Sequence, residues 1–323
     1  MRTSLKKWYF IYIVGIPAVI MVAQFFAFKN YDVYSLSRYS YKFNHACWVD
    51  SKPEYIVLGS STARYSVIPK LIADMNGIDP ERVVNLAMNA ATPWQNYNTY
   101  DINIDTLREA KVVYYNLDPW ILTERYYKHS TYERILWNHA QWKQFAEEER
   151  AANNYFMPAS LFLRNFSRRK CRVEFDDRGY SRLQTRDLRP LDEWEYGKWY
   201  RAGDVFGISE FELKYIRELK SIVEKNGSEF VILLIPKHQR WLTAYSKETE
   251  FDGQLVDRLN DLLGKVRVVG SYDAARYNLT DQDFFDNYHL SHSGAEKYTQ
   301  IEFTNIQRHL DIPMLPFRNL YSY

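Results

Sequence analysis

The chain has 323 residues, of which 25% are charged, and its formal net charge is +2. This nearly neutral balance argues against a nucleic-acid partner, which a strongly basic surface would attract. Aromatic residues are common, with 27 Tyr and 9 Trp, and exposed rings of this kind suit stacking on sugars or contact with a membrane interface. No internal repeat, low-complexity tract or long Gly/Ser linker is evident in the sequence.

The N-terminal stretch is predicted to be a membrane anchor. Residues 8–28 carry no charged side chain, and as a helix rising about 1.5 Å per residue they would cross a bilayer core of about 30 Å. Three basic residues precede the run and only Lys29 follows it closely, which predicts a cytoplasmic N-terminus and an extracytoplasmic domain. A cleaved signal peptide is the alternative. The run is long for one and no small-x-small cleavage site follows, so an uncleaved anchor is favoured.

Two cysteines, Cys47 and Cys171, would then lie in an oxidising compartment. They could form a disulfide bond there, but the sequence does not fix the distance between their Cα atoms. Their pairing therefore stays open.

The first predicted strand leads into a cluster of small hydroxyl residues. Four apolar residues, 55–58, predict a strand buried on both faces of a parallel sheet. Gly59 allows a sharp turn, so Ser60 and Ser61 lie at the carboxyl end of the strand, where open α/β sheets bind ligands. A serine there lies beside main-chain N–H groups that can stabilise an oxyanion. A serine-capped helix with no catalytic role is the alternative.

The pattern that follows alternates strands and helices. Further strands are predicted at 82–88, 111–117, 229–235 and 266–269. Helices are predicted from Pro69 to Gly77, from Pro93 after a Thr92/Gln95 capping box, from Ser209 to Gly227, near 250–264, and from a Ser293/Glu296 capping box to about His309. This alternation predicts an α/β fold with a parallel sheet and right-handed crossovers.

Residues 119–207 break this alternation and are interpreted as a helical, cap-like insertion near the active edge of the sheet. Its basic residues include Arg164, Arg168, Arg169, Lys170, Arg172, Arg178, Arg182, Arg186 and Arg189. They would contact a polyanionic or glycan substrate, or a membrane partner. Because Asp and Glu are interspersed among them, an ordinary solvated surface is the alternative.

A second polar block precedes the last predicted helix. Asp286 and His289 lie three residues apart in a tight turn, so a carboxylate oxygen can bond Nδ1 and leave Nε2 free to accept a proton from a serine. A structural Asp–His pair is one alternative. A metal site that also includes His292 is another, but a further ligand is missing nearby, so no metal is expected.

The two polar blocks resemble the first and last sequence blocks of the SGNH (GDSL-like) hydrolase superfamily. Gly59-Ser60-Ser61 matches Gly-x-Ser with Ser60 in place of the usual Asp, and Asp286-x-x-His289 matches the last block. The resemblance covers residues 54–309. It implies a flavodoxin-like three-layer α/β/α sandwich, with Ser61 as nucleophile, His289 as general base and Asp286 orienting the base. The predicted parts of the chain are 1–29 (cytoplasmic tip and transmembrane anchor), 30–53 (linker), 54–118 with 208–310 (α/β domain), 119–207 (insertion) and 311–323 (C-terminal tail).

Within this superfamily the chain is most similar to single-pass extracytoplasmic members that accompany membrane-bound O-acyltransferases, namely the D-alanyl transfer protein of teichoic acid synthesis and the alginate O-acetylation proteins. The anchor, the Gly-Ser-Ser block, residues 84–87 and the insertion carry this similarity. It implies O-acetyl transfer to an envelope or exported polysaccharide at the cytoplasmic (inner) membrane, with a membrane-bound O-acyltransferase partner, a periplasmic catalytic domain and no cofactor. A carbohydrate O-acetyl esterase and a non-catalytic polysaccharide-binding scaffold are the alternatives.

Two blocks that normally supply oxyanion donors are altered in this chain. Asn89 or Ala90 replaces the usual Gly of the second block, and only Asn-Leu-Asp at 116–118 remains of the third. The candidate oxyanion donors are Ser61, Asn89 and Asn116. The candidate substrate contacts are His238, Arg64 and Trp94, with a solvent-facing loop position as the alternative for His238.

Overall fold

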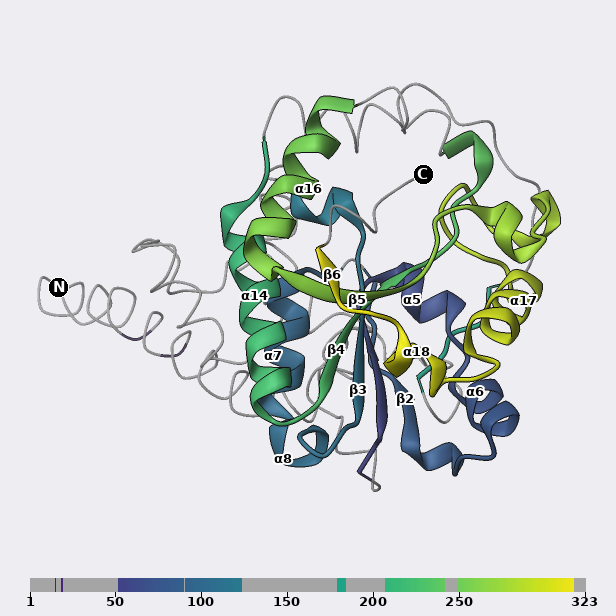
Figure 1. Ribbon diagram of the computed structural model, residues 1–323, viewed down its shortest axis with the longest axis horizontal. Helices are drawn as coiled ribbons and strands as arrows, with labels where there is room; N and C mark the ends of the chain where they lie inside the picture. The colour runs from purple at the N-terminus through teal and green to yellow at the C-terminus, as the bar shows by residue number, and fades with distance from the viewer. Residues whose placement is uncertain are drawn as a thin grey trace, which may run out of the picture. The chain divides into compact units, whose positions relative to one another are not determined.

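The computed structural model describes residues 52–89, 91–123, 179–183, 207–241 and 249–316, together with Gly15 and Val19 (Figure 1). The chain divides into two compact units, one of residues 1–41 with 131–172 and one of 42–130 with 173–323. Apart from Gly15 and Val19, the described residues all belong to the second unit. The predicted anchor otherwise lies outside them, as do both cysteines, nearly all of the linker and most of the insertion. No helix among the described residues is long and apolar enough to cross a membrane.

Six strands form one mostly parallel sheet in the order β2-β1-β3-β4-β5-β6. They are β1 (Tyr55–Leu58), β2 (Val83–Asn85), β3 (Val112–Asn116), β4 (Glu229–Leu234), β5 (Lys265–Gly270) and β6 (Leu315–Pro316). The first five pair in parallel, with Ile56 opposite Val84 on one side of β1 and opposite Val113 on the other. The predicted parallel α/β sheet is therefore confirmed. β6 was not predicted, because it comes from the segment interpreted as a tail, and it pairs antiparallel to β5.

Helices cover both faces of this sheet (Figure 1). The α-helices are α5 (Ser61–Ser66), α6 (Pro69–Asn76), α7 (Pro93–Ile102), α8 (Ile104–Leu107), α14 (Glu210–Lys225), α16 (Thr249–Leu263), α17 (His292–Phe303) and α18 (Arg308–Asp311). Short 3-10 helices are η3 (Pro80–Arg82), η4 (Pro119–Leu122), η5 (Ala274–Tyr277) and η6 (Asp281–Asp283).

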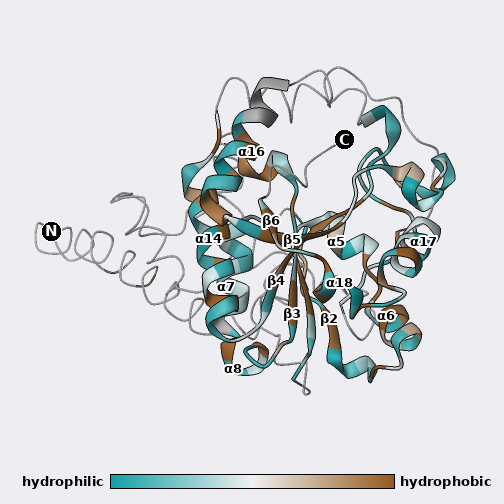
Figure 2. Ribbon diagram, in the orientation of Figure 1, coloured by the Kyte–Doolittle hydropathy of each residue, from teal (hydrophilic) through white to brown (hydrophobic). Residues whose placement is uncertain are grey.

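Alternate residues of β1 enter two separate hydrophobic cores. Ile56 and Leu58 pack with α7, α14 and α16, whereas Tyr55 and Val57 pack with α5, α6 and α17. Figure 2 shows the strands as the hydrophobic centre of the domain. Each fully buried aliphatic side chain contributes about 1.5–3 kcal/mol to stability through removal from water. The apolar run that predicts β1 therefore also holds this strand between the two layers of helices.

Local capping signals set several helix ends as predicted. Thr92 and Gln95 form a complete capping box at α7, with Pro93 at the first helical position. Gly77 ends α6 in the left-handed conformation (φ 61°), which L-residues with a Cβ disfavour. Ser209 caps α14, but the carboxylate of Glu212 accepts from Trp94 N at 3.1 Å and so links α14 to α7.

The last long helix differs from the prediction at both ends. Its N-cap is Ser291, whose hydroxyl accepts from Gly294 N, and the helix ends at Phe303 rather than near His309. Ser293 is not the cap, because its hydroxyl donates to Asp283 at 3.1 Å. The N–H of Ser291 donates to the Asp283 carbonyl at 2.9 Å, so a tertiary contact selects between two serines that both fit the local pattern.

The two ends of the predicted insertion meet at the carboxyl edge of the sheet. Thr123 and Ile208 form an isolated antiparallel bridge, and Ser209 N donates to Leu122 O at 2.7 Å. A short described segment, 179–183, returns to the α/β domain, where Ser181 N donates to Arg64 O at 3.2 Å. The described ends of the insertion therefore lie side by side, and its segment 179–183 contacts the domain separately at Arg64.

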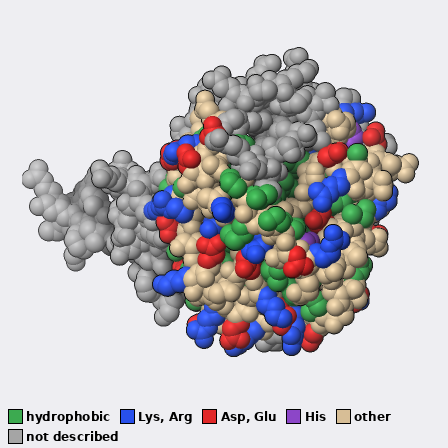
Figure 3. All heavy atoms as spheres, viewed as in Figure 1, with side chains coloured by type: hydrophobic (Ala, Val, Ile, Leu, Met, Phe, Trp, Pro, Cys, Tyr) green, Lys and Arg blue, Asp and Glu red, His purple; other side chains and the backbone are tan. Residues whose placement is uncertain are grey.

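On the face seen in Figure 3, acidic and basic side chains of the described residues are interspersed. Exposed pairs such as Lys220–Glu224, at 2.9 Å, contribute only about 0–1 kcal/mol each. The stability of the domain therefore comes mainly from the two hydrophobic cores.

Candidate active site

The candidate site begins at a sharp turn after β1. Gly59 has φ 142° and its N–H donates to Asn96 Oδ1 at 2.8 Å. A Cβ on Gly59 would lie 2.6 Å from Asn116 Cβ, so the close approach of β1 and β3 requires glycine here. Ser60 then caps α5, its hydroxyl accepting from Thr62 N at 3.2 Å, and Ser61 is the first residue of the helix.

Asn85, at the end of β2, holds α5 in place. Its side-chain amide donates to the carbonyls of Ala63 and Val67 at 2.9 Å each, and its Oδ1 accepts from Ala87 N at 3.0 Å. All these bonds are buried, which makes them costly to break. The segment 84–87, noted in the sequence for its resemblance, thus positions the helix that carries Ser61.

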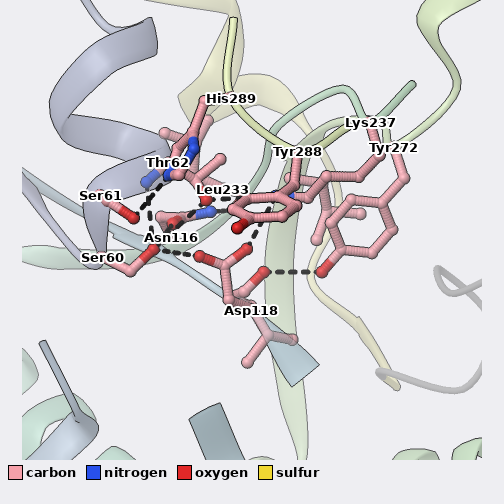
Figure 4. Close-up of polar contacts among 12 residues, drawn as sticks. Ser60, Ser61, Thr62, Asn116, Asp118, Leu233, Lys237, Tyr272, Tyr288 and His289 are labelled. Carbon is pink, nitrogen blue, oxygen red and sulfur yellow. Dashed lines mark hydrogen bonds and ion pairs between the residues drawn. The ribbon is translucent and has the colours of Figure 1, made fainter. Parts of the chain in front are cut away.

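The structure brings Ser61, His289 and Asp286 into one hydrogen-bonded chain (Figure 4 labels Ser61 and His289). Ser61 Oγ lies 2.7 Å from His289 Nε2, and His289 Nδ1 lies 2.8 Å from Asp286 Oδ2. A proton on Nδ1 donates to the carboxylate, which leaves Nε2 to accept the serine hydroxyl proton. The arrangement can therefore activate Ser61 as a nucleophile.

The carboxylate of Asp286 is held in its ionised form. Burial raises the pKa of Asp286, but the charge and hydrogen bond of His289 lower it, as do the N–H groups of Tyr288 and His289 that donate to Oδ1 at 3.0 and 2.7 Å. The net effect lowers the pKa of Asp286 below its ordinary 3.8. At neutral pH a negative charge therefore faces Nδ1 of the imidazole at 2.8 Å.

Two tyrosines flank the imidazole of His289. The ring of Tyr65 meets it edge-on with centroids 5.5 Å apart, and the ring of Tyr288 lies 4.5 Å away. The hydroxyl of Tyr65 accepts from Asn89 Nδ2 at 2.9 Å. The catalytic loop is closed by Phe285 N, which donates to His289 O at 2.9 Å. These contacts fix the ring in the orientation that both hydrogen bonds require.

A buried polar layer lies directly beneath the nucleophile turn (Figure 4). The hydroxyl of Ser60 donates to Asp118 Oδ2, and Lys237 Nζ donates to Asp118 Oδ1 at 3.0 Å. Lys237 Nζ also donates to Thr62 Oγ1 at 3.2 Å. Lys237 was not predicted from the sequence to belong to the site. The available signal was a charged residue three positions after the carboxyl end of β4, the edge at which such sheets bind ligands.

The candidate oxyanion donors differ in their placement. Asn116 is buried: its Oδ1 lies 3.4 Å from Ser60 Oγ, and its Nδ2 donates to Leu233 O at 3.4 Å. Asn89 lies beside the nucleophile turn, because Met88 N donates to Gly59 O at 3.1 Å, but its Nδ2 is bonded to Tyr65. The N–H of Ser61 is a first-turn amide with no acceptor inside the helix. The backbone of Ser61 is therefore the best placed of the three.

The three candidate substrate contacts are all buried. His238, 4% exposed, bonds Asp281 Oδ1 at 3.0 Å and accepts from Arg240 N, so the solvent-facing alternative is wrong. Arg64 Nε donates to Ser181 Oγ at 3.0 Å. Trp94 is fully buried among the aromatic rings of α14. These placements explain the residues by packing and hydrogen bonding and do not support substrate contact.

No group of His, Cys, Asp and Glu side chains within the described residues is arranged to hold a metal ion. His292, the third residue of the metal alternative, instead places Nδ1 2.7 Å from Tyr180 OH and Nε2 3.4 Å from Glu296. Its side chain is therefore engaged with the segment 179–183 and with its own helix.

A scan against protein-family models and a search of curated proteins find no match to this sequence. What the molecule itself offers toward a function is the geometry of the site and the chemistry of the residues that compose it.

Proposed function

We propose that this chain is a serine O-acyltransferase of the SGNH type, in which Ser61 carries the acyl group. The observation that supports this most directly is the hydrogen-bonded chain from Ser61 through His289 to Asp286. Ser61 Oγ would attack the carbonyl carbon of an acyl donor while His289 Nε2 takes the hydroxyl proton. The N–H of Ser61 would stabilise the oxyanion, and His289 would then protonate the leaving group, which produces acyl-Ser61.

In the second half of the reaction an acceptor hydroxyl would repeat these steps in reverse. His289 would take the proton of the acceptor, the acceptor oxygen would attack the acyl carbon, and Ser61 would leave with the proton from His289. The acceptor we propose is a hydroxyl of an envelope or exported polysaccharide, and the group transferred is acetyl. A water molecule in the same position would make the chain a carbohydrate O-acetyl esterase.

The topology of the sheet supports the finer fold assignment, a flavodoxin-like three-layer α/β/α sandwich. In the order β2-β1-β3-β4-β5, β2 is added on one side of β1 and the later strands are added on the other side, so the switch point lies between β1 and β3. Ligands of such folds bind at that switch point, beyond the carboxyl ends of the strands. Ser61 follows β1, and Asn116 and Asp118 close β3. The candidate site thus occupies the position where this architecture places active sites.

Covalent labelling tests the proposed activity. A fluorophosphonate or an activated acetyl ester is expected to modify Ser61 of the wild type and to leave His289→Ala unmodified, because the base is absent. Ser66→Ala is the matched control, since it removes a hydroxyl from the same helix and, within the described residues, that hydroxyl has no hydrogen-bond partner. Adding the polysaccharide should move acetyl from Ser61 to sugar. Release to water alone would favour the esterase, and an unlabelled wild type would favour the non-catalytic scaffold.

We further propose a single-pass anchor over 8–28 with the domain outside the cytoplasm, beside a membrane-bound O-acyltransferase that supplies the acyl group. The uncharged run and its preceding basic residues support this topology. A reporter enzyme that works only outside the cytoplasm, fused after Tyr323, should be active. Activity of a cytoplasm-specific reporter at the same position would contradict the topology and, with it, the extracytoplasmic substrate.

A further inference from the structure

We propose that Lys237 and Asp118 form a buried ion pair whose role is to position the nucleophile, by holding the two hydroxyl residues on either side of Ser61. This inference rests on the proposed function. It assigns a positioning role to two residues that neither contact the reacting atoms nor belong to the chain from Ser61 to Asp286.

The contacts form a closed polar ring beneath the turn (Figure 4). Both carboxylate oxygens of Asp118 are used, one by Lys237 Nζ at 3.0 Å and the other by the Ser60 hydroxyl. Lys237 Nζ reaches Thr62 Oγ1 at 3.2 Å, and Thr62 Oγ1 lies 3.3 Å from Ser60 Oγ. Ser60 and Thr62 are thereby fixed relative to each other, and Ser61 is the residue between them.

The ring also ties together three neighbouring strands at their carboxyl ends. Ser60 follows β1, Asp118 follows β3 and Lys237 follows β4. The next residue, His238, donates from its N–H to the Asn287 carbonyl at 3.0 Å, and Asn287 belongs to the loop that carries Asp286 and His289. The dipeptide 237–238 therefore contacts both segments that carry the candidate triad, α5 through Thr62 and the loop of Asp286 and His289 through Asn287.

Stability alone does not account for such a pair. Both side chains are 0% exposed, and taking two charges out of water costs several kcal/mol, so well-packed apolar residues of similar volume are often as stable. What an apolar pair lacks is direction: it could not accept the Ser60 proton or donate to Thr62. The geometry that a nucleophile needs is sensitive at this scale, since a displacement of about 1 Å can cost about 10²-fold in rate.

Lys237 also interacts electrostatically with the carboxylate of Asp286. Burial lowers the pKa of Lys237 more than the carboxylates of Asp118 and Asp286 raise it, so the net effect is a lowered pKa. In its ammonium form Lys237 balances the charge of the Asp118 carboxylate at 3.0 Å while it donates to Thr62 at 3.2 Å.

The test removes both charges at once, because removing one would leave the other buried and unpaired. In the double variant Lys237→Met with Asp118→Asn we expect a folded protein whose kcat for an activated acetyl ester falls about 10²-fold, with KM changed less than about threefold. The matched control is Arg267→Met with Glu229→Gln, which neutralises an ion pair between β5 and β4 at the opposite end of β4. This control should retain the wild-type kcat.

A milder variant covers the case in which the double variant does not fold. Thr62→Val keeps the shape of the side chain and removes the hydroxyl that Lys237 and Ser60 both contact, so kcat should fall about threefold to tenfold with KM unchanged. Wild-type kcat in a folded double variant, or in Thr62→Val, would overturn the positioning role while leaving the proposed function intact. A wild-type protein that neither turns over the ester nor labels at Ser61 would overturn both.

Discussion

Ser61→Ala and His289→Ala should each abolish acyl transfer, and the double variant should be no slower than either single one. The reason is the 2.7 Å contact between Ser61 Oγ and His289 Nε2, which makes the two side chains one proton-transfer unit. Without Ser61 there is no nucleophile for His289 to deprotonate, and without His289 there is no base to deprotonate Ser61. By analogy with other serine triads, each loss should be about 10⁴–10⁶ in turnover. Initial rates at saturating concentrations of an activated acetyl ester, corrected for the uncatalysed rate, measure these losses.

Asp286→Ala is expected to cost less than either of these changes. The carboxylate holds the imidazole through Nδ1 and stabilises its protonated form, but it does not itself take the serine proton. His289 would keep the contacts with Tyr65 and Tyr288 that restrict its ring. Two results would contradict the assignment of roles. One is a loss of turnover in the Ser61/His289 double variant that equals the product of the two single losses, and the other is a loss for Asp286→Ala larger than that of Ser61→Ala and of His289→Ala.

The sequence was sufficient to predict that Ser61, Asp286 and His289 come together. An apolar run followed by Gly59 and small hydroxyl residues indicates a strand end, and parallel strands share the edge at which they end. The Asp286/His289 spacing places both side chains in one turn before a helix. These two local patterns, combined with the parallel sheet, bring residues 228 positions apart in the sequence within hydrogen-bond distance.

The sequence was not sufficient for contacts that depend on packing between elements. The ring of Ser60, Asp118, Thr62 and Lys237 forms because β1, β3 and β4 are neighbours in register, which no local pattern reveals. β6 is two residues long and carries no periodicity. His238 is a polar residue in a loop after a strand, which is typical of an exposed position, yet it is buried against Asp281 and Asn287.

The glycine at the turn after β1 is a position where a single added methyl group should damage both the fold and the candidate site. In Gly59→Ala the new Cβ would lie 2.6 Å from Asn116 Cβ and 3.3 Å from Asn116 Cα. Asn116 is buried in β3 between β1 and β4, so it cannot move aside without shifting the sheet. The φ of 142° adds backbone strain for a residue that has a Cβ.

We expect Gly59→Ala to lower the free energy of unfolding by about 2–6 kcal/mol, the sum of overpacking and backbone strain, and to reduce turnover in whatever fraction stays folded, because the turn also sets Ser61. Gly77→Ala is the matched control: Gly77 also has a positive φ, 61°, but no atom lies within 4 Å of its would-be Cβ. Left-handed strain alone should cost that variant about 1–2 kcal/mol. Urea unfolding of the two variants and the wild type measures the difference. Equal losses of stability at both glycines would show that the approach of Gly59 to Asn116 imposes no steric requirement. In that case β3 would not help to shape the turn that carries Ser61.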